Sequence, residues 1–188
     1  MQNHPAGLSQ SVVIIIDAQK EYQSGRLPLP GFAGAVAEIQ KLLLRARANR
    51  VPVIHVAHTG KPGSPVFDPE KEFARIVDEL KPEAGEIMVG KHFPNSFTQT
   101  SLDEDLKRVG RTDLIIVGFM THMCVSSTVR QAAEKGYRCT VIAKACATRD
   151  LPDTEVGVVS ASVIQASHLA AIADRFAVVL QFQDEIPD

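Results

Sequence analysis

The chain contains no tryptophan, and aromatic residues make up only 5% of its 188 positions. A hydrophobic core must therefore be built mainly from aliphatic side chains. No apolar run approaches the roughly 20 residues that a membrane-spanning helix needs. The formal net charge is only −2, and lysine and arginine form no cluster. These features argue against nucleic acid or a membrane as a partner.

Cysteine is also scarce. The three cysteines are Cys124, Cys139 and Cys146, an odd and sparse set that does not suggest a disulfide framework. The first ten residues, MQNHPAGLSQ, lack the basic-then-apolar order of a signal peptide. We therefore expect a reducing, cytoplasmic location. Length and composition are typical of a single domain over residues 1–188.

Short apolar runs alternate along the chain with longer amphipathic ones. The short runs predict strands at 12–16, 53–57, 86–89, 114–117, 139–143 and 176–180. Helical spacing predicts helices at 32–46, 125–133 and 156–170, with Gly136 ending the second, while residues 59–68 should form a surface excursion. Continuously apolar strands indicate burial on both faces. The pattern predicts an α/β fold, a three-layer α-β-α sandwich around a six-stranded parallel sheet.

Reactive side chains follow three of the predicted strands. Asp17 comes after the first strand, Lys91 after the third and Cys124 after the fourth. Ligands of open parallel sheets bind beyond the carboxyl ends of the strands. Taken singly, each residue has a commoner structural role, as a turn aspartate, a surface lysine or an inert buried cysteine. Their convergence on one sheet edge favours catalysis.

A thiol at the start of a helix suits nucleophilic chemistry. The helix dipole and a nearby cation, here Lys91, lower the pKa of a thiol, and the thiolate is the nucleophile. The amides of residues 120–124 lie where a helix begins, so they are available to stabilise an oxyanion. Asp17 is placed to take the thiol proton and return it to a leaving group.

Four stretches together carry a specific resemblance. They are VVIIIDAQKEY (12–22), GKHFPNSF (90–97), GFMTHMCVSST (118–128) and ACATRD (145–150). Over essentially its whole length the sequence resembles the isochorismatase-like cysteine hydrolase superfamily. The similarity is to the amide-cleaving branch that includes nicotinamidases and N-carbamoylsarcosine amidohydrolases. The family fold is a six-stranded parallel sheet flanked by helices, which agrees with the strand pattern.

The resemblance also implies roles for particular residues. It makes Asp17, Lys91 and Cys124 the catalytic set. It implies a non-proline cis peptide at Phe119–Met120, which would turn the Met120 N–H toward the substrate carbonyl beside the Cys124 N–H. These two amides would form the oxyanion hole. The resemblance further leads us to expect a homo-oligomer, a dimer or a tetramer.

The metal motif of the nicotinamidases is not preserved. That motif is Asp-x-His after the second strand, but the matching stretch HVAHTG places His58 and Gly60 at those positions. His55 and His58 are three apart, so if the strand includes both they point to opposite faces. Two histidines are an incomplete ligand set. We therefore expect no metal and no cofactor, and nicotinamide becomes a less favoured substrate.

Residues close in sequence to the catalytic set are expected to contact a small-molecule substrate. They are Gln19, Tyr22, Phe93, Asn95, Phe97, His122 and Met123. Structural roles compete for several of them, since Phe97 suits the core, Asn95 a turn, Met123 helix packing and His122 a solvated helix start. Arg149 and Asp150 suggest an ion pair that braces a loop, and His168 suggests a helix or subunit contact.

Retention of Cys124 favours acyl transfer. The sequence therefore predicts hydrolysis of a small non-peptide C–N bond, of the amide or ureide type, through a thioester intermediate. One alternative is hydrolysis of an isochorismate-like vinyl ether, which would require cationic anchors for two carboxylates. Apart from Lys91, the candidate anchors are Lys144 and Arg149. A second alternative is a non-catalytic binding protein on the same fold, whose signature would be the loss of a catalytic residue.

Overall fold

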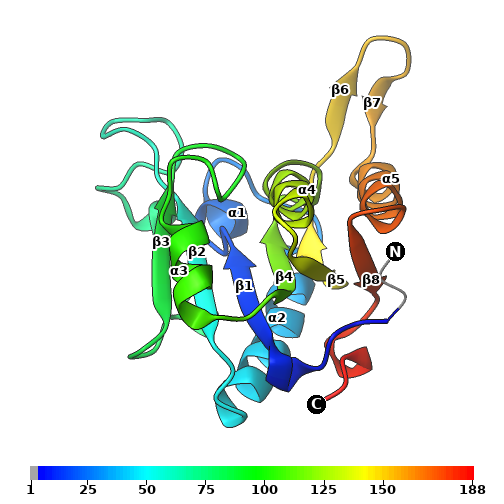
Figure 1. Cartoon of the computed structure of the whole chain (residues 1–188). Coiled ribbons are helices and arrows are strands. Elements are labelled where there is room, and N and C mark those ends of the chain that lie inside the picture. Colours follow the sequence, from blue (N-terminus) through cyan, green and yellow to red (C-terminus); the bar gives the residue numbers. More distant parts are fainter. Residues whose placement is uncertain (1–3) are drawn as a thin grey trace.

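A computed structural model describes residues 4–188 of the chain, so the first three residues of the expected domain lie outside the described part. Its centre is a six-stranded parallel sheet with the order β3-β2-β1-β4-β5-β8 (Figure 1). The strands are β1 (Ser11–Ile16), β2 (Val53–His58), β3 (Ile87–Lys91), β4 (Asp113–Phe119), β5 (Arg138–Ala147) and β8 (Ala177–Leu180). The predicted fold class is therefore confirmed.

Helices cover both faces of this sheet (Figure 1). The long helix α2 (Phe32–Ala48) packs on one face, while α3 (Leu102–Val109), α4 (Ser126–Glu134) and α5 (Ala161–Ala173) pack on the other. Short helical turns complete the described chain: η1 (Leu8–Gln10), α1 (Glu21–Ser24), η2 (Glu72–Ala74), η3 (Asp78–Leu80), η4 (Thr121–Val125) and η5 (Gln183–Glu185).

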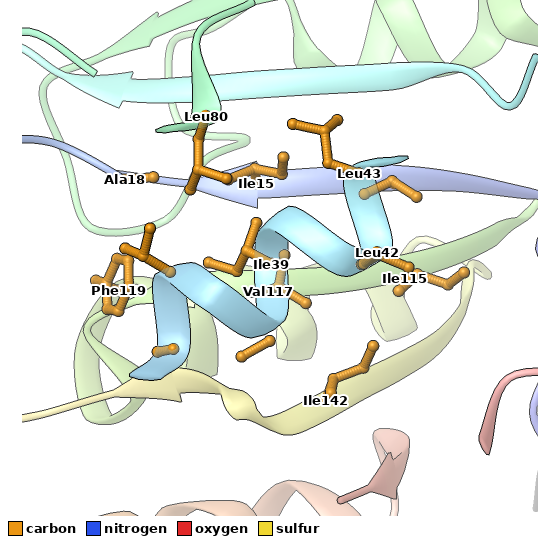
Figure 2. Packing of buried hydrophobic residues seen from close by; sticks show 14 of the residues in the cluster. Ile15, Ala18, Ile39, Leu42, Leu43, Leu80, Ile115, Val117, Phe119 and Ile142 are labelled. Carbon is orange, nitrogen blue, oxygen red and sulfur yellow. The ribbon is translucent and has the colours of Figure 1, made fainter. Parts of the chain in front are cut away.

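The central strand β1 shows why the strands are apolar throughout. Val13 and Ile15 join the core beneath α2, whereas Val12, Ile14 and Ile16 join the core beneath α3, α4 and α5. All six residues of β1 are buried. Figure 2 shows α2 lying across the sheet, with Ile39 and Leu42 close to Val117 and Ile115. Alternate side chains of the strand therefore pack into two separate hydrophobic cores, one on each face of the sheet.

The predicted last helix, 156–170, begins too early. Its first residues instead belong to the second strand of a hairpin. The hairpin consists of β6 (Leu151–Asp153) and β7 (Gly157–Val159) and projects from the body of the protein (Figure 1). Gly157 has a φ of 78°, which suits glycine at the turn. Helix α5 starts only at Ala161, after Ser160 accepts a hydrogen bond from the Val163 N–H. The valines that gave the helical spacing belong partly to the hairpin.

Two further elements differ from the sequence prediction. Helix α3 was not predicted, because only Leu102 and Leu106 provide its buried apolar positions. Its acidic first turn, basic last turn and Gly110 at φ 74° are the signals that would have identified it. Strand β5 extends beyond its predicted end at residue 143 to Ala147. Its register with β4 shifts in this part, so that Gly118 pairs with Cys146.

Helix α5 is apolar on all sides yet largely open to solvent. Among its residues ASVIQASHLAAIA only Ile172 is buried. A helix that is apolar all round is normally covered. The expected homo-oligomer stays a prediction. Within residues 4–188, no helix has both the length and the apolar character needed to cross a membrane.

A buried polar network joins α2 to β2 and to the residue before β3. Glu86 accepts hydrogen bonds from Arg47 at 2.8 and 3.0 Å and lies 2.8 Å from Nε2 of His55, which is fully buried. Burial alone would raise the pKa of Glu86, but Arg47, the Glu83 amide and His55 lower it to about 2. Glu86 therefore stabilises the fold as a carboxylate.

Replacing Glu86 by Gln should lower the free energy of unfolding by about 1–2 kcal/mol at pH 7. The folded-state pKa lies below the unfolded value, so this contribution is complete above the unfolded pKa and is lost as pH falls toward about 2. Urea unfolding from pH 7 to pH 3 should show the two proteins converging. Glu83→Gln, an exposed partner of Arg47, is the control and should change little. A difference independent of pH would contradict the prediction.

Gly118 of β4 pairs with Ile16 of β1. Its φ is 120°, and a Cβ atom there would lie 2.1 Å from the Ile16 carbonyl oxygen. Since the obstacle is backbone, Gly118→Ala should lower the free energy of unfolding by roughly 3 kcal/mol or more. Gly90→Ala in β3, where a Cβ atom meets nothing within 4 Å, should be nearly neutral. Urea unfolding measures both, and a wild-type stability for Gly118→Ala would refute the steric argument.

Candidate active site

Three side chains from three strand ends meet in the protein interior. Lys91 Nζ lies 2.8 Å from Asp17 Oδ2 and 3.3 Å from Cys124 Sγ. Asp17 and Lys91 are fully buried, and Cys124 is only 4% exposed. The convergence predicted from the sequence is therefore present, with the ammonium in contact with both the carboxylate and the thiol.

Local backbone geometry directs the side chains of Asp17, Lys91 and Cys124 toward one another. Asp17 has a φ of 51°, a conformation that aspartate tolerates better than most residues, and its N–H donates to the Val56 carbonyl at 2.8 Å. Lys91 ends β3, paired with His58 of β2. Cys124 lies in η4, a π-helical turn in which the Val125 N–H reaches back to the Met120 carbonyl at 3.2 Å. The Phe119–Met120 peptide bond is cis, as the resemblance implied.

The resting thiol is not activated in the way the sequence suggested. Burial raises the pKa of Cys124 to about 12, and the neighbouring Asp17 charge adds to this increase. Lys91 acts in the opposite direction but does not outweigh them. The expectation of a lowered thiol pKa is therefore wrong for the free site. The reason is that the helix start and the cation lie inside the core, together with a carboxylate.

Asp17 is equipped to move a proton. Burial raises its pKa, while Lys91 opposes the increase. Although Lys91 Nζ is close to Oδ2, neither Asp17 oxygen has a well-aligned hydrogen-bond donor within residues 4–188. Its carboxylate thus retains the capacity to accept a proton from the thiol or from a bound molecule.

His58 is a member of this cluster that the sequence offered only as a metal ligand. Its Nδ1 lies 3.4 Å from Lys91 Nζ. Burial, followed by the charges of Lys91 and His92, lowers its pKa to about 4. His58 is therefore neutral near pH 7, which leaves Nδ1 free to accept a hydrogen bond from the ammonium. His55 contacts Glu86 instead, and the described residues contain no group of three or more potential ligands suited to a metal.

Four of the expected substrate residues lie around the catalytic cluster. Tyr22 is buried, and burial followed by the charges of Asp17 and Cys124 raises its pKa. Phe93 accepts a hydrogen bond from Lys91 through its carbonyl, while its side chain is exposed. Met123 directly precedes Cys124 and is partly exposed. His122 is half-buried, with Nδ1 2.5 Å from Thr148 Oγ1. Their contacts with substrate stay predictions.

The other three expected substrate residues have structural roles. Gln19 is fully buried, and both of its amide protons are used on the carbonyls of His58 and Ala74. The Asn95 side chain accepts from the Phe97 N–H, as in an Asx turn. The Phe97 ring stacks on Tyr137 at 6.2 Å and joins the core. These contacts hold the loops around the site, and contacts of the three residues with substrate stay predictions.

The surface excursion at 59–68 returns to this region. Its first part is mostly exposed, but Phe67 is buried at the far end. The Phe67 ring contacts Tyr22 at 5.3 Å and His58 at 5.0 Å. The expectation of a surface loop thus holds for most of the segment and fails at Phe67. Sequence patterning gave no sign of this, because a single apolar residue in a loop has no period.

The segment after β5 also differs from expectation. Asp150 accepts a hydrogen bond from the Ala161 N–H at 2.7 Å. Arg149 has no ion pair within residues 4–188, so the predicted Arg149–Asp150 pair is absent there. His168 of α5 contacts the His122 ring at 5.9 Å, which agrees with a packing role.

One groove of the protein lies apart from the catalytic cluster. This groove, of about 740 Å³, lies between the start of α2, the end of β5 and α5, and includes Cys146 and Gln165 in its lining. Asp17, Lys91 and Cys124 do not line it. We assign the active site to the cluster because reactive groups in contact identify chemistry better than volume does.

Comparison with known proteins shows the family to which the chain is related. The family model described as the isochorismatase domain matches residues 11–183. The chain is 39% identical over 179 residues to a secreted isochorismatase effector of Verticillium dahliae, covering 95% of this chain and 92% of that protein. It is 32% identical over 164 residues to a ureidoacrylate amidohydrolase of Rhizobium rhizogenes, covering 69% and 67%.

A solved structure shows the same fold. The crystal structure of an isochorismatase from Pseudomonas putida KT2440 superposes with a TM-score of 0.92 at 47% identity, covering 96% of this chain and 92% of that one. The secreted relative leaves the expected cytoplasmic location a prediction.

Asp17→Asn should make Cys124 easier to alkylate near pH 7. The substitution removes a charge that raises the thiol pKa and leaves the Lys91 ammonium beside the sulfur. Iodoacetamide labelling followed by peptide mass spectrometry should show faster modification of Cys124 in the variant than in the wild type. Cys139, whose thiol pKa is also raised to about 12, provides an internal control in the same digest. Slower labelling of Cys124 in the variant would mean that Asp17 generates the resting thiolate.

Proposed function

This chain belongs to the isochorismatase family, and from that premise we propose that it hydrolyses a small non-peptide amide or ureide through a thioester on Cys124. It is a hydrolase of that family, with amidohydrolases among its relatives. The observation that carries the proposal is the contact of Lys91 Nζ with both Asp17 at 2.8 Å and Cys124 at 3.3 Å. A binding protein would have no need of this buried arrangement.

In the first step the thiol becomes a nucleophile only as the reaction begins. The high resting pKa of Cys124 means that its proton must leave as sulfur approaches the substrate carbonyl. Asp17 accepts that proton, and Lys91 stabilises the charge on sulfur. A bond forms between Sγ and the carbonyl carbon, and the carbonyl oxygen becomes an oxyanion. The Met120 and Cys124 amides are assigned to hold this oxyanion by the family resemblance.

In the second step the C–N bond breaks. Asp17 donates its proton to the departing nitrogen, which leaves an acyl thioester on Cys124. Asp17, again a carboxylate, removes a proton from a water molecule that attacks the thioester carbon. The C–S bond then breaks, the acid is released, and the proton on Asp17 returns to sulfur. Lys91 remains protonated throughout and acts by charge.

The site favours acyl transfer over vinyl-ether hydrolysis. A vinyl-ether hydrolase needs an acid near the ether oxygen but has no use for a nucleophilic thiol. Here the thiol contacts the buried lysine, and the buried Lys91–Asp17 pair would be costly to keep in the core without a function. The ureidoacrylate amidohydrolase relative supports a C–N bond as the target.

Cys124→Ala should reduce turnover to roughly 10⁻³ of the wild-type rate or less, because the nucleophile acts as a unit with its partners. The measurement is ammonia release from a panel of small amides and ureides, with isochorismate assayed alongside by product analysis. Cys139→Ala, which removes a different buried thiol, is the matched control and should retain activity. Isochorismate turnover that survives Cys124→Ala would instead support the vinyl-ether reaction.

A further inference from the structure

Two buried hydroxyls join the segment after Lys91 to the helix after Cys124. Ser96 and Thr128 are both fully buried. The Ser96 N–H donates to Oγ1 of Thr128 at 3.0 Å, and the Thr128 hydroxyl donates in turn to Oγ of Ser96 at 2.9 Å. These two bonds form a clasp between Ser96 and Thr128. The Ser96–Thr128 clasp directly links the two chain segments that carry the ammonium and the thiol.

Thr128 lies close to the nucleophile along its helix. Cys124 belongs to the π-helical turn that leads into α4, and Thr128 follows it by four positions, which is about one helical turn. Side chains four positions apart lie on the same face of a helix. The clasp therefore holds α4 on the face that carries the sulfur.

The segment on the other side of the clasp is held at both ends. The Ser96 carbonyl accepts a hydrogen bond from the Thr100 hydroxyl at 2.5 Å. Toward β3, the Phe93 carbonyl accepts a hydrogen bond from Lys91 Nζ at 3.2 Å. The chain between Lys91 and Ser96 is thus fixed to the ammonium at one end and to α4 at the other.

The contact between the ammonium and the sulfur is the weaker of the two catalytic contacts. Lys91 Nζ lies 2.8 Å from Asp17 Oδ2 but 3.3 Å from Cys124 Sγ, and sulfur is a weak hydrogen-bond acceptor. The ion pair joins β3 to β1, whereas the cysteine follows β4. The charge and the hydrogen bond of Lys91 both lower the pKa of the Cys124 thiol. A small separation of the two segments would keep the ion pair and remove this support from the thiolate.

We propose that the Ser96–Thr128 clasp sets the distance between the Lys91 ammonium and the Cys124 sulfur, so that Ser96 and Thr128 are positioning residues for the nucleophile. This inference rests on the proposed function, because the distance matters to catalysis only if sulfur becomes an anion. Neither hydroxyl takes part in bond breaking. Both act through Lys91 and Cys124.

Thr128→Val tests the clasp, because it replaces the hydroxyl by a methyl group and removes both bonds. With the amide or ureide of the panel that the wild type hydrolyses fastest, kcat should fall about 10- to 100-fold, while KM changes less than about twofold. Thr128→Ser keeps the hydroxyl and should hold kcat within about threefold of the wild type. Thr140→Val makes the same change at another buried threonine, within β5, and should leave kcat unaltered.

Alkylation of Cys124 responds in opposite directions to a positioning role and to a merely structural one. If the clasp holds Lys91 beside the sulfur, Thr128→Val should raise the thiol pKa further and slow iodoacetamide labelling near pH 7 about 3- to 10-fold. If the substitution only loosens the fold, the buried thiol becomes more accessible and is labelled faster. Cys139 in the same digest reports any general opening. Unchanged or faster labelling of Cys124, or a wild-type kcat, would overturn the proposal.

Ser96→Ala keeps the test decisive if Thr128→Val does not fold. It removes the Oγ acceptor but keeps the bond from the Ser96 N–H to Thr128, so kcat should fall less, about 3- to 10-fold. Wild-type kcat and wild-type labelling in Ser96→Ala would refute the clasp. The double variant should be no slower than Thr128→Val alone, because valine has already removed both bonds. Additive losses would show that the two hydroxyls act separately and would also refute it.

Failure of this inference differs from failure of the proposed function. If Cys124→Ala abolishes amide turnover while Thr128→Val keeps wild-type kcat and labelling, the hydrolase proposal stands and the clasp is refuted. If the wild type hydrolyses no amide or ureide, but Cys124 labelling slows in Thr128→Val and not in Thr140→Val, the reaction is wrong and the positioning of the ammonium is retained.

Discussion

The ion pair between Lys91 and Asp17 is the constraint on which the rest of the site depends. Both side chains are fully buried, so each would be expensive to ionise alone, and the 2.8 Å contact opposes the desolvation cost of the pair. The two residues come from β3 and β1, with β2 between them. The sheet must therefore keep its register for the pair to form. Gly118 is part of that requirement, because it lets β4 approach the residue before Asp17.

The Lys91–Asp17 pair also affects the pKa of the Cys124 thiol. Charges of opposite sign on Lys91 and Asp17 largely cancel, and burial then dominates the pKa of Cys124. A neutral thiol at rest is protected from adventitious alkylation and oxidation, since the thiolate is the reactive form. In the mechanism that we propose, activation is linked to substrate binding, because proton transfer from Cys124 to Asp17 becomes favourable only when sulfur can form a bond. His58, neutral and within 3.4 Å of Lys91, helps to keep the ammonium in place.

Residues that do not touch the Cys124 sulfur hold the loops and side chains around it. Gln19 and Asn95 fix the loops through backbone contacts, and Phe67 closes over Tyr22 and His58. Arg149 brings a buried donor, its Nε, that has no hydrogen-bond partner within residues 4–188 to the same edge of the sheet. Helix α5 remains apolar and largely open to solvent, which is typical of a surface covered by another molecule.

The sequence by itself determined the six strands and the meeting of Asp17, Lys91 and Cys124 at one edge of the sheet, because buried parallel strands are apolar throughout and reactive residues follow their carboxyl ends. The sequence pattern wrongly predicted helix at residues 156–159, because the valines of this exposed hairpin share the spacing of a helix. Tertiary structure alone decided the thiol pKa, the place of His58 and Phe67 and the unpaired state of Arg149. Each of these depends on burial and on charges brought together from distant segments, which local patterns do not encode.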